Sequence, residues 1–234
     1  MQKFGLGMGI PLYVHPAIDP VAWASLAKPG LPVDWVVINQ SNGPGDPEDA
    51  AIGDAARAVK ATGADILGYI DADYGDRTDF AVFQDATTWA GRGYTGAFVD
   101  RVPTAVDKVA VMAGKINGLR AKGLSHIVLN MGTIPVTEQY ARIADQLVVF
   151  EGHADDYEDA VFPFWMNNYS PSTFVHMVSS VSADQVADVV RLARQRPVGS
   201  LWMYESPNVG TSGNKWDGLP AYLYRLMSLM RQRA

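Results

Sequence analysis

The chain contains no cysteine, which excludes structural disulfides, cysteine-ligated metal sites and thiol nucleophiles. It also lacks the clustered Lys and Arg residues that phosphate binding requires. Together with a formal net charge of −6, this argues against nucleic acid as a partner. No apolar run approaches the roughly 18 residues of a membrane-spanning helix, so we expect no membrane span.

The N-terminal stretch, residues 1–16, is apolar but interrupted by Gly and Pro, and it has no small-residue cleavage site. We interpret it as the first strand and not as a signal peptide. The lack of cysteine leaves the compartment open, because a secreted protein of this size does not need disulfides. A cellular and a viral (phage) origin are both open.

The rest of the chain predicts alternating strands and helices. Short β-branched or aromatic runs indicate strands, and the longer segments between them have helical periodicity. The predicted strands are residues 9–14, 35–39, 66–70, 96–100, 126–131, 146–151, 174–179 and 200–205. Eight such units predict an α/β fold, a single-domain (β/α)₈ TIM barrel over residues 1–234, and we expect a monomer. An open doubly wound sheet is the main alternative.

Several helix boundaries can also be predicted. Asp46 followed by Pro47 indicates an N-cap and a first helical turn. Ser182 and Gln185 have the spacing of a capping box. The spacing of Val106, Val109, Ala113 and Ile116 predicts the buried stripe of the helix after residue 100, and the last helix is expected to begin near Pro220.

Most of the predicted strands end on a polar side chain. In a parallel barrel the active site lies at the carboxyl ends of the strands, so these residues are expected to converge on one rim. They are His15, Asn39, Asp71, Asp100, Asn130, Glu151 and Glu205. Strand alternation predicts that Phe98 points inward with Asp100, and that Leu147 and Val149 point inward with Glu151. The alternative for any one of them is a polar strand end that only meets solvent.

Asp100 and Glu151 end the fourth and sixth strands and would face each other across the barrel mouth. Two carboxylates in this arrangement are typical of a glycosidase, in which one protonates the departing oxygen and the other attacks the anomeric carbon or activates water. Aromatic residues near the mouth would offer faces for sugar rings, although core packing is the alternative for each. They are Tyr13, Tyr69, Tyr74, Trp165, Trp202, Tyr204 and Trp216.

An ordered set of motifs resembles the spherulin-4-like family, which includes glycoside hydrolase family 135. The motifs are PLYVHP (11–16), VVINQSNGPG (36–45), LGYIDADYGDR (67–77), GAFVD (96–100), IVLNMGTIP (127–135), ADQLVVFEG (144–152) and NKWDGLPAYL (214–223). The resemblance implies a (β/α)₈ barrel and endo-hydrolysis of α-1,4-linked galactosamine-containing polysaccharide. It also implies that Asp100 and Glu151 are the catalytic residues.

This sequence departs from the family pattern immediately after Asp100. The family has Asp-Glu at the end of the fourth strand, whereas here Arg101 follows Asp100. Arg101 has three interpretations: it lowers the pKa of Asp100 and keeps it ionised as a nucleophile, it binds an anionic or hydroxyl-rich substrate, or it marks a barrel that binds without catalysis. Asp71, Asp73 and Asp76 would still offer negative charge to a cationic polymer.

Our prediction is therefore an endo-acting glycoside hydrolase of a microbial surface or matrix polysaccharide, with an extracellular or surface location. Asp100 is the predicted nucleophile and Glu151 the predicted acid/base of a retaining mechanism. The predicted substrate-binding residues are Tyr13, His15, Asn39, Tyr69, Asp71, Asp73, Tyr74, Arg101, Asn130, Trp202, Tyr204 and Glu205. No cofactor and no metal are expected. A non-catalytic carbohydrate-binding barrel and a hydrolase of a different bacterial cell-wall glycan are the alternatives.

Overall fold

The computed structural model describes residues 5–45, 47–205, 216 and 218–231. Eight parallel strands form one sheet in sequential order. They are β1 (Met8–Pro11), β2 (Val33–Ile38), β3 (Asp65–Asp71), β4 (Gly96–Asp100), β5 (His126–Asn130), β6 (Gln146–His153), β7 (Phe174–Ser179) and β8 (Ser200–Met203). The predicted strands agree with these to within a few residues at each end.

The sheet closes between its first and last strands. Gly7, just before β1, donates its N–H to the carbonyl of Gly199 at 2.8 Å and accepts from the N–H of Leu201 at 2.9 Å. A parallel bridge pairs Gly7 with Ser200 at the same point. The predicted barrel is therefore confirmed, and the open doubly wound sheet is wrong.

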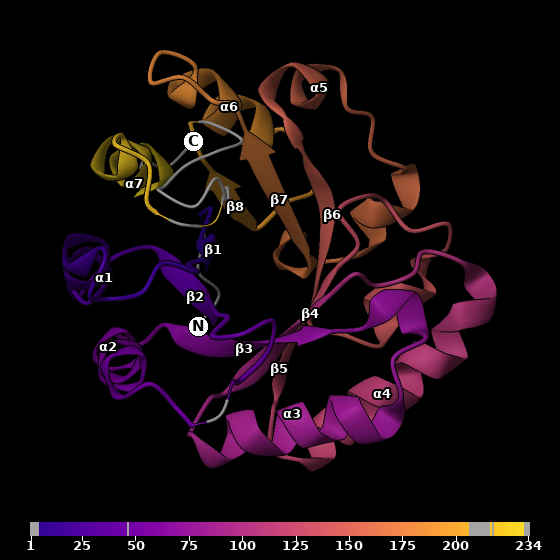
Figure 1. Cartoon of the computed structure of the whole chain (residues 1–234). Coiled ribbons are helices and arrows are strands. Elements are labelled where there is room, and N and C mark those ends of the chain that lie inside the picture. The colour runs from indigo at the N-terminus through magenta and orange to yellow at the C-terminus, as the bar shows by residue number, and fades with distance from the viewer. Residues whose placement is uncertain (1–4, 46, 206–215, 217, 232–234) are drawn as a thin grey trace.

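Helices surround the barrel on the outside (Figure 1). They are α1 (Pro20–Leu26), α2 (Ala50–Lys60), α3 (Asp79–Gly91), α4 (Val109–Ala121), α5 (Ala154–Asp159), α6 (Val186–Arg194) and α7 (Leu223–Arg231). Short 3₁₀ helices add η1 (Asp73–Gly75), η2 (Val106–Lys108), η3 (Glu138–Arg142), η4 (Phe164–Asn168) and η5 (Pro171–Thr173). Only η3 connects β5 to β6, so this unit lacks the α-helix that the (β/α)₈ prediction gives it.

Three predicted helix features differ from the structure. The N-cap of α2 is Asp49, whose carboxylate accepts from the N–H groups of the first turn, and the predicted cap Asp46 lies outside the described residues. Val106 is 52% exposed and precedes α4, whose buried residues include Met112 and Leu119. Ile116 is buried as predicted, whereas Val109 and Ala113 are only half-buried, so the predicted stripe is correct at Ile116 and wrong at Val106. Ser182 and Gln185 do interact, but α6 begins after both.

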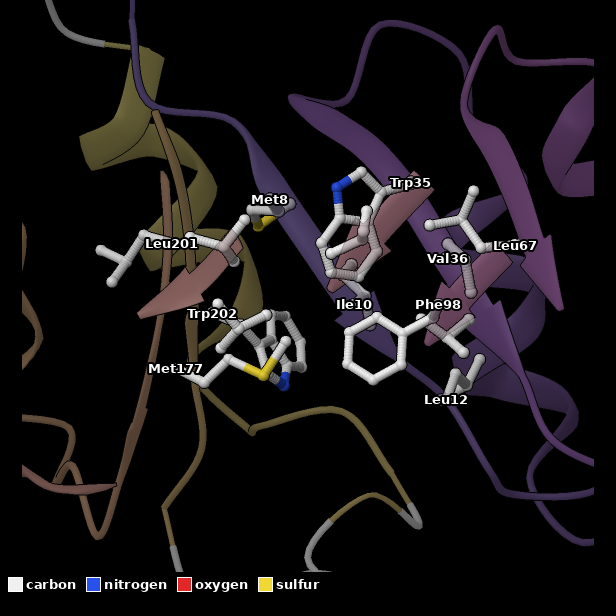
Figure 2. Close-up of a cluster of buried hydrophobic side chains, with 14 of the residues drawn as sticks. Met8, Ile10, Leu12, Trp35, Val36, Leu67, Phe98, Met177, Leu201 and Trp202 are labelled. Carbon is white, nitrogen blue, oxygen red and sulfur yellow. The ribbon is translucent and has the colours of Figure 1, made fainter. Parts of the chain in front are cut away.

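The barrel interior is packed with large side chains (Figure 2). Trp35 from β2 and Phe98 from β4 lie with their ring centroids 5.8 Å apart. Trp35 also crosses the interior, since its indole N–H donates to Gln146 of β6 at 2.6 Å. A Cβ at Gly9 would lie 2.1 Å from the Trp35 ring, so only glycine leaves room for that ring beside β1. Because side chains fill the interior, we expect the functional site at the rim of the barrel.

The outer face of β7 carries a buried histidine away from that rim. His176 is fully buried; the Tyr157 hydroxyl lies 2.8 Å from its Nδ1, and the Phe162 ring stacks on it at 4.5 Å. Arg196 lies over the rings of both Tyr157 and Phe162. Burial lowers the pKa of His176 from 6.5 to about 3.

Acid is therefore expected to destabilise the fold through His176. Below pH 6.5 the unfolded chain binds a proton at this side chain, whereas the folded chain binds it only near pH 3. Stability is lost as the pH falls through this window, by about 1.4 kcal/mol per pH unit for one proton. We expect wild type to lose more unfolding free energy than His176→Gln between about pH 7 and about pH 5, measured by urea denaturation. Equal losses would contradict the prediction.

Candidate active site

The carboxyl ends of four neighbouring strands bring predicted site residues together. Asp71 and Asp100 are Cα partners at the ends of β3 and β4. Asn130 ends β5, and Glu151 lies near the end of β6. Asp71 and Asn130 are buried, whereas Asp100 and Glu151 are half-buried and so within reach of a ligand at the mouth. The structure thus places the two predicted carboxylates side by side, and their catalytic roles stay a prediction.

Glu151 reaches the interior because β6 carries a β-bulge, where its register on β7 shifts midway along the strand. Gln146, at the start of β6, also points inward, since it binds Trp35 across the barrel. Gln146 and Glu151 are five positions apart, an odd spacing that a regular strand would place on opposite faces. The predicted shared inward face of Leu147, Val149 and Glu151 is therefore wrong, because alternation restarts at the bulge.

Asn130 holds the two carboxylates at a short separation. Its Nδ2 donates to Oδ1 of Asp100 at 2.8 Å and to Oε2 of Glu151 at 3.0 Å. Because one nitrogen serves both acceptors, these two oxygens lie no farther apart than the sum of the distances, about 5.8 Å. The Oδ1 of Asn130 in turn accepts from the N–H of Gly132. Both donors and the acceptor of Asn130 are engaged, so it positions the carboxylates.

Gly132 is a site residue that the sequence analysis missed. Its carbonyl accepts from the N–H of Glu151 at 2.9 Å, while its own N–H holds Asn130. Its φ of +63° lies in the left-handed region that favours glycine. The available signal was the Asn-Met-Gly sequence at the end of a predicted strand, which is typical of a tight turn.

The pKa of Asp100 is raised above its ordinary value of 3.8. Burial is the largest cause, and the nearby charge of Glu151 raises it further. Hydrogen bonds oppose this shift: Tyr69 donates its hydroxyl to Oδ2 at 2.9 Å, and Asn130 and the backbone N–H of Arg101 also donate. Three donors thus hold Asp100 in place, in a site where burial disfavours its ionised form.

Arg101 turns away from Asp100 and binds Asp71. Its φ is +53°, and its Nε donates to Oδ1 of Asp71 at 2.8 Å while Nη2 binds Oδ2. Nη2 also lies 3.0 Å from Asp73. Burial on its own would raise the pKa of Asp71, but the bonds and charge of Arg101 lower it overall. The interpretation that the charge of Arg101 lowers the pKa of Asp100 and keeps it ionised is therefore wrong, because the backbone N–H of Arg101 lowers that pKa while burial raises it overall.

A row of aromatic rings lines the mouth beside Asp100. Tyr13 meets Tyr69 edge to face, with ring centroids 6.0 Å apart, and also contacts Trp216 at 6.4 Å. Trp216 contacts Tyr204 at 5.0 Å. Tyr13 and Trp216 are half-buried, whereas Tyr69 and Tyr204 are buried. The two partly exposed rings are the ones that can offer a face to a sugar.

Two predicted sugar platforms do not face the mouth: one lies in the core, and the other packs against it. Trp202 is 1% exposed, and its Cα partner across β7 and β8 is the fully buried Met177. Inward alternation therefore places Trp202 in the barrel interior, below the mouth. Trp165 contacts Tyr169 and Phe174, where β7 begins, so it lies at the opposite end of the barrel. Core packing explains both.

The remaining predicted residues lie on the rim in differing states. Both ring nitrogens of His15 have partners within the chain: Nδ1 accepts from the N–H of Ala17, and Nε2 lies 3.2 Å from the Asp49 carboxylate. Asn39 accepts from the N–H of Gly43 and so shapes the turn after β2. The other residues are exposed, although Asp73 and Tyr74 contact Arg101, and their binding roles stay predictions: Asp73, Tyr74 and Glu205.

Backbone strain points independently to this rim. The non-glycine residues with positive φ in the described part of the chain are Asn42, Asp73, Tyr74, Arg101 and Ser180. All of them lie in segments that follow the carboxyl ends of β2, β3, β4 and β7. Strain of this kind concentrates at functional sites, where the surrounding structure holds it in place.

Within the described ranges, no group of three His, Asp or Glu side chains is placed to hold a metal ion. No helix in those ranges is long and apolar enough to cross a membrane.

Comparisons with known proteins agree with the fold. A family model described as "Spherulation-specific family 4" matches residues 8–230. Spherulin-4 of Physarum polycephalum is 30% identical over 146 residues, which make up 61% of this chain and 43% of that protein. The chain thus spans less than half the length of this curated relative.

Among solved structures, Aspergillus clavatus Sph3 in complex with GalNAc aligns over 99% of this chain and 100% of that chain, with a TM-score of 0.81 and 22% identity. A chitinase from Chromobacterium violaceum aligns over 97% of this chain and 100% of that chain, with a TM-score of 0.58 and 12% identity. These similarities show a shared barrel fold.

Proposed function

We propose that this chain, which belongs to spherulation-specific family 4, is a glycoside hydrolase that cleaves a microbial surface or matrix polysaccharide. Its substrate class is an α-1,4-linked polymer of N-acetylgalactosamine and galactosamine, and it acts outside the cell or at a surface. The family resemblance supports the reaction class. The similarity to a barrel solved with GalNAc supports the sugar.

The observation that carries the proposal is the bridge that Asn130 makes between Asp100 and Glu151. The bridged oxygens lie within about 5.8 Å of each other. Retaining glycosidases hold their two carboxyl groups about 5–5.5 Å apart, and inverting enzymes need about 6.5–9.5 Å to admit a water. The short separation supports a retaining mechanism.

In the first step, an Asp100 oxygen bonds to the anomeric carbon while Glu151 gives its proton to the departing glycosidic oxygen. The bond between the anomeric carbon and that oxygen breaks, which leaves a glycosyl ester on Asp100 and a carboxylate on Glu151. In the second step, Glu151 takes a proton from water, the water oxygen bonds to the anomeric carbon, and Asp100 departs. Two inversions retain the anomeric configuration.

The residues around Asp100 suit a nucleophile. Tyr69 and Asn130 donate to its two different oxygens, which orients the carboxylate and stabilises its negative charge. Because burial raises its pKa, Asp100 is more basic than an exposed aspartate. The half-buried rings of Tyr13 and Trp216 lie beside it, where a sugar ring would stack.

The test is product analysis on defined glycans. The purified chain is incubated with an α-1,4-linked galactosamine–N-acetylgalactosamine polymer and with a panel of bacterial cell-wall glycans. We expect mass spectrometry to find new oligosaccharides from the first, and proton NMR to find the α-anomer before mutarotation. The β-anomer as first product would refute retention. Cleavage of a cell-wall glycan alone would change the substrate, and binding with no cleavage anywhere would indicate a carbohydrate-binding barrel.

A further inference from the structure

The rim beside Asp100 carries acidic residues that are already paired with cations. The sequence suggested that Asp71, Asp73 and Asp76 could receive a cationic polymer, but two cations of the chain pair with these three carboxylates. Arg101 binds Asp71 and Asp73, and Lys108 binds Asp76 at 2.7 Å. These two cations offset two of the three negative charges, so the attraction for a cationic sugar is reduced on this side of the mouth.

Arg101 is held in this position from several sides. Its guanidinium forks onto both oxygens of Asp71, lies 3.0 Å from Asp73 and sits over the Tyr74 ring at 5.5 Å from the centroid. The anchor Asp71 is itself buried at the end of β3 as the Cα partner of Asp100. A guanidinium is thus fixed on the rim by Asp71, whose strand neighbour is Asp100.

The guanidinium is still accessible to a ligand. The Arg101 side chain is 41% exposed, and its Nη1 makes no hydrogen bond to a described residue. Nη1 can donate to a hydroxyl or to the carbonyl of an acetamido group. A sugar ammonium at the same place would instead meet a like charge that Asp71 prevents from swinging away.

We propose that Arg101, anchored by Asp71, is a specificity-determining residue that favours uncharged, N-acetylated sugar residues next to the cleavage point over residues with a free amine. This inference rests on the proposed function and names the chemical form of its substrate. The presence of Arg101 in place of the family's second acid is thus explained by substrate selection. It does not disrupt the predicted catalytic pair, because Asn130 still joins Asp100 and Glu151.

The test compares two matched substrates: α-1,4-linked N-acetylgalactosamine oligomers and the same oligomers after partial de-N-acetylation. The chain variants are wild type, Arg101→Gln, Arg101→Lys and the control Lys108→Gln, which removes a rim cation that pairs with Asp76. The readout is the ratio of kcat/KM for the acetylated oligomer to that for the deacetylated one. Dissociation constants of the same variants in a Glu151→Gln background provide a readout that does not need turnover.

We expect wild type to prefer the acetylated oligomer by about tenfold or more, and Arg101→Gln to lose most of that preference through a lower KM for the amine form. Arg101→Lys should keep the preference in part, Lys108→Gln should keep it fully, and added salt should weaken it. An unchanged ratio in Arg101→Gln, or a wild-type preference for the amine form, would overturn the inference. If the chain binds the acetylated oligomer more tightly but cleaves neither, the proposed hydrolysis is wrong and the selectivity of Arg101 stands. If it binds neither oligomer, both proposals are wrong.

Discussion

Asp100→Asn is expected to lower kcat on the polysaccharide by about 10³-fold or more, because an amide cannot form the glycosyl ester. The replacement has nearly the same shape, and its amide can still pair with the Tyr69 hydroxyl and with Asn130 after the hydroxyl rotates. We therefore expect a loss of turnover with retained oligosaccharide binding. The measurement is kcat from reducing-end release together with calorimetric binding of an oligomer.

Azide separates the roles of the two carboxylates. In Asp100→Ala, azide can bond to the anomeric carbon from the vacated face, and the expected product is a glycosyl azide of inverted configuration. In Glu151→Ala the ester on Asp100 still forms with an activated aryl glycoside, and azide then opens it to give the retained azide. If Asp100→Ala gives the retained azide and Glu151→Ala the inverted one, Glu151 is the nucleophile and Asp100 the acid/base. Asp188→Asn, a change of the same type on the outer helix α6, is the control and should keep wild-type turnover.

The strands of this fold could be predicted because they are short, apolar and separated by helical periodicity. The β4 and β7 boundaries match residue for residue. The bulge in β6 could not be predicted, since the residues around it are uniformly apolar and a shift of register leaves no local signal. Two errors have one cause, which is that periodicity does not reveal which face a tertiary neighbour covers. They are the helix expected between β5 and β6 and the expected burial of Val106.

That Asp100, Asn130 and Glu151 lie at one rim followed from strand order, because parallel strands deliver their carboxyl ends to one rim, whereas the inward direction of Glu151 depends on the bulge in β6. The partner of Arg101 did not follow. Arg101 binds Asp71, thirty positions earlier, through a left-handed backbone conformation that no sequence rule assigns to arginine. Trp202 shows the complementary error, since aromatic character cannot distinguish a sugar platform from a ring packed below the mouth.

Asn130→Asp is expected to lower kcat by about 10²-fold or more near pH 6, although it changes the side chain by one atom. The new carboxylate would stand where Nδ2 now contacts Asp100 at 2.8 Å and Glu151 at 3.0 Å. Two donated hydrogen bonds would become contacts between carboxyl groups, and three carboxyls this close cannot all ionise. The measurement is the pH dependence of kcat/KM.

The direction of the pH shift follows from Asp100. In wild type its pKa is already raised, and a nucleophile must be ionised, so activity falls as the pH drops through that pKa. A third carboxyl raises the pKa further, so we expect the acidic limb of Asn130→Asp to move up by about one unit or more and activity to recover partly above it. Asn130→Ala removes the bridge without adding charge and should shift the limb less. Asn117→Asp adds the same charge on the exposed face of α4 and should leave the profile in place. If the alkaline limb moves instead, Asp100 is the general acid and Glu151 the nucleophile.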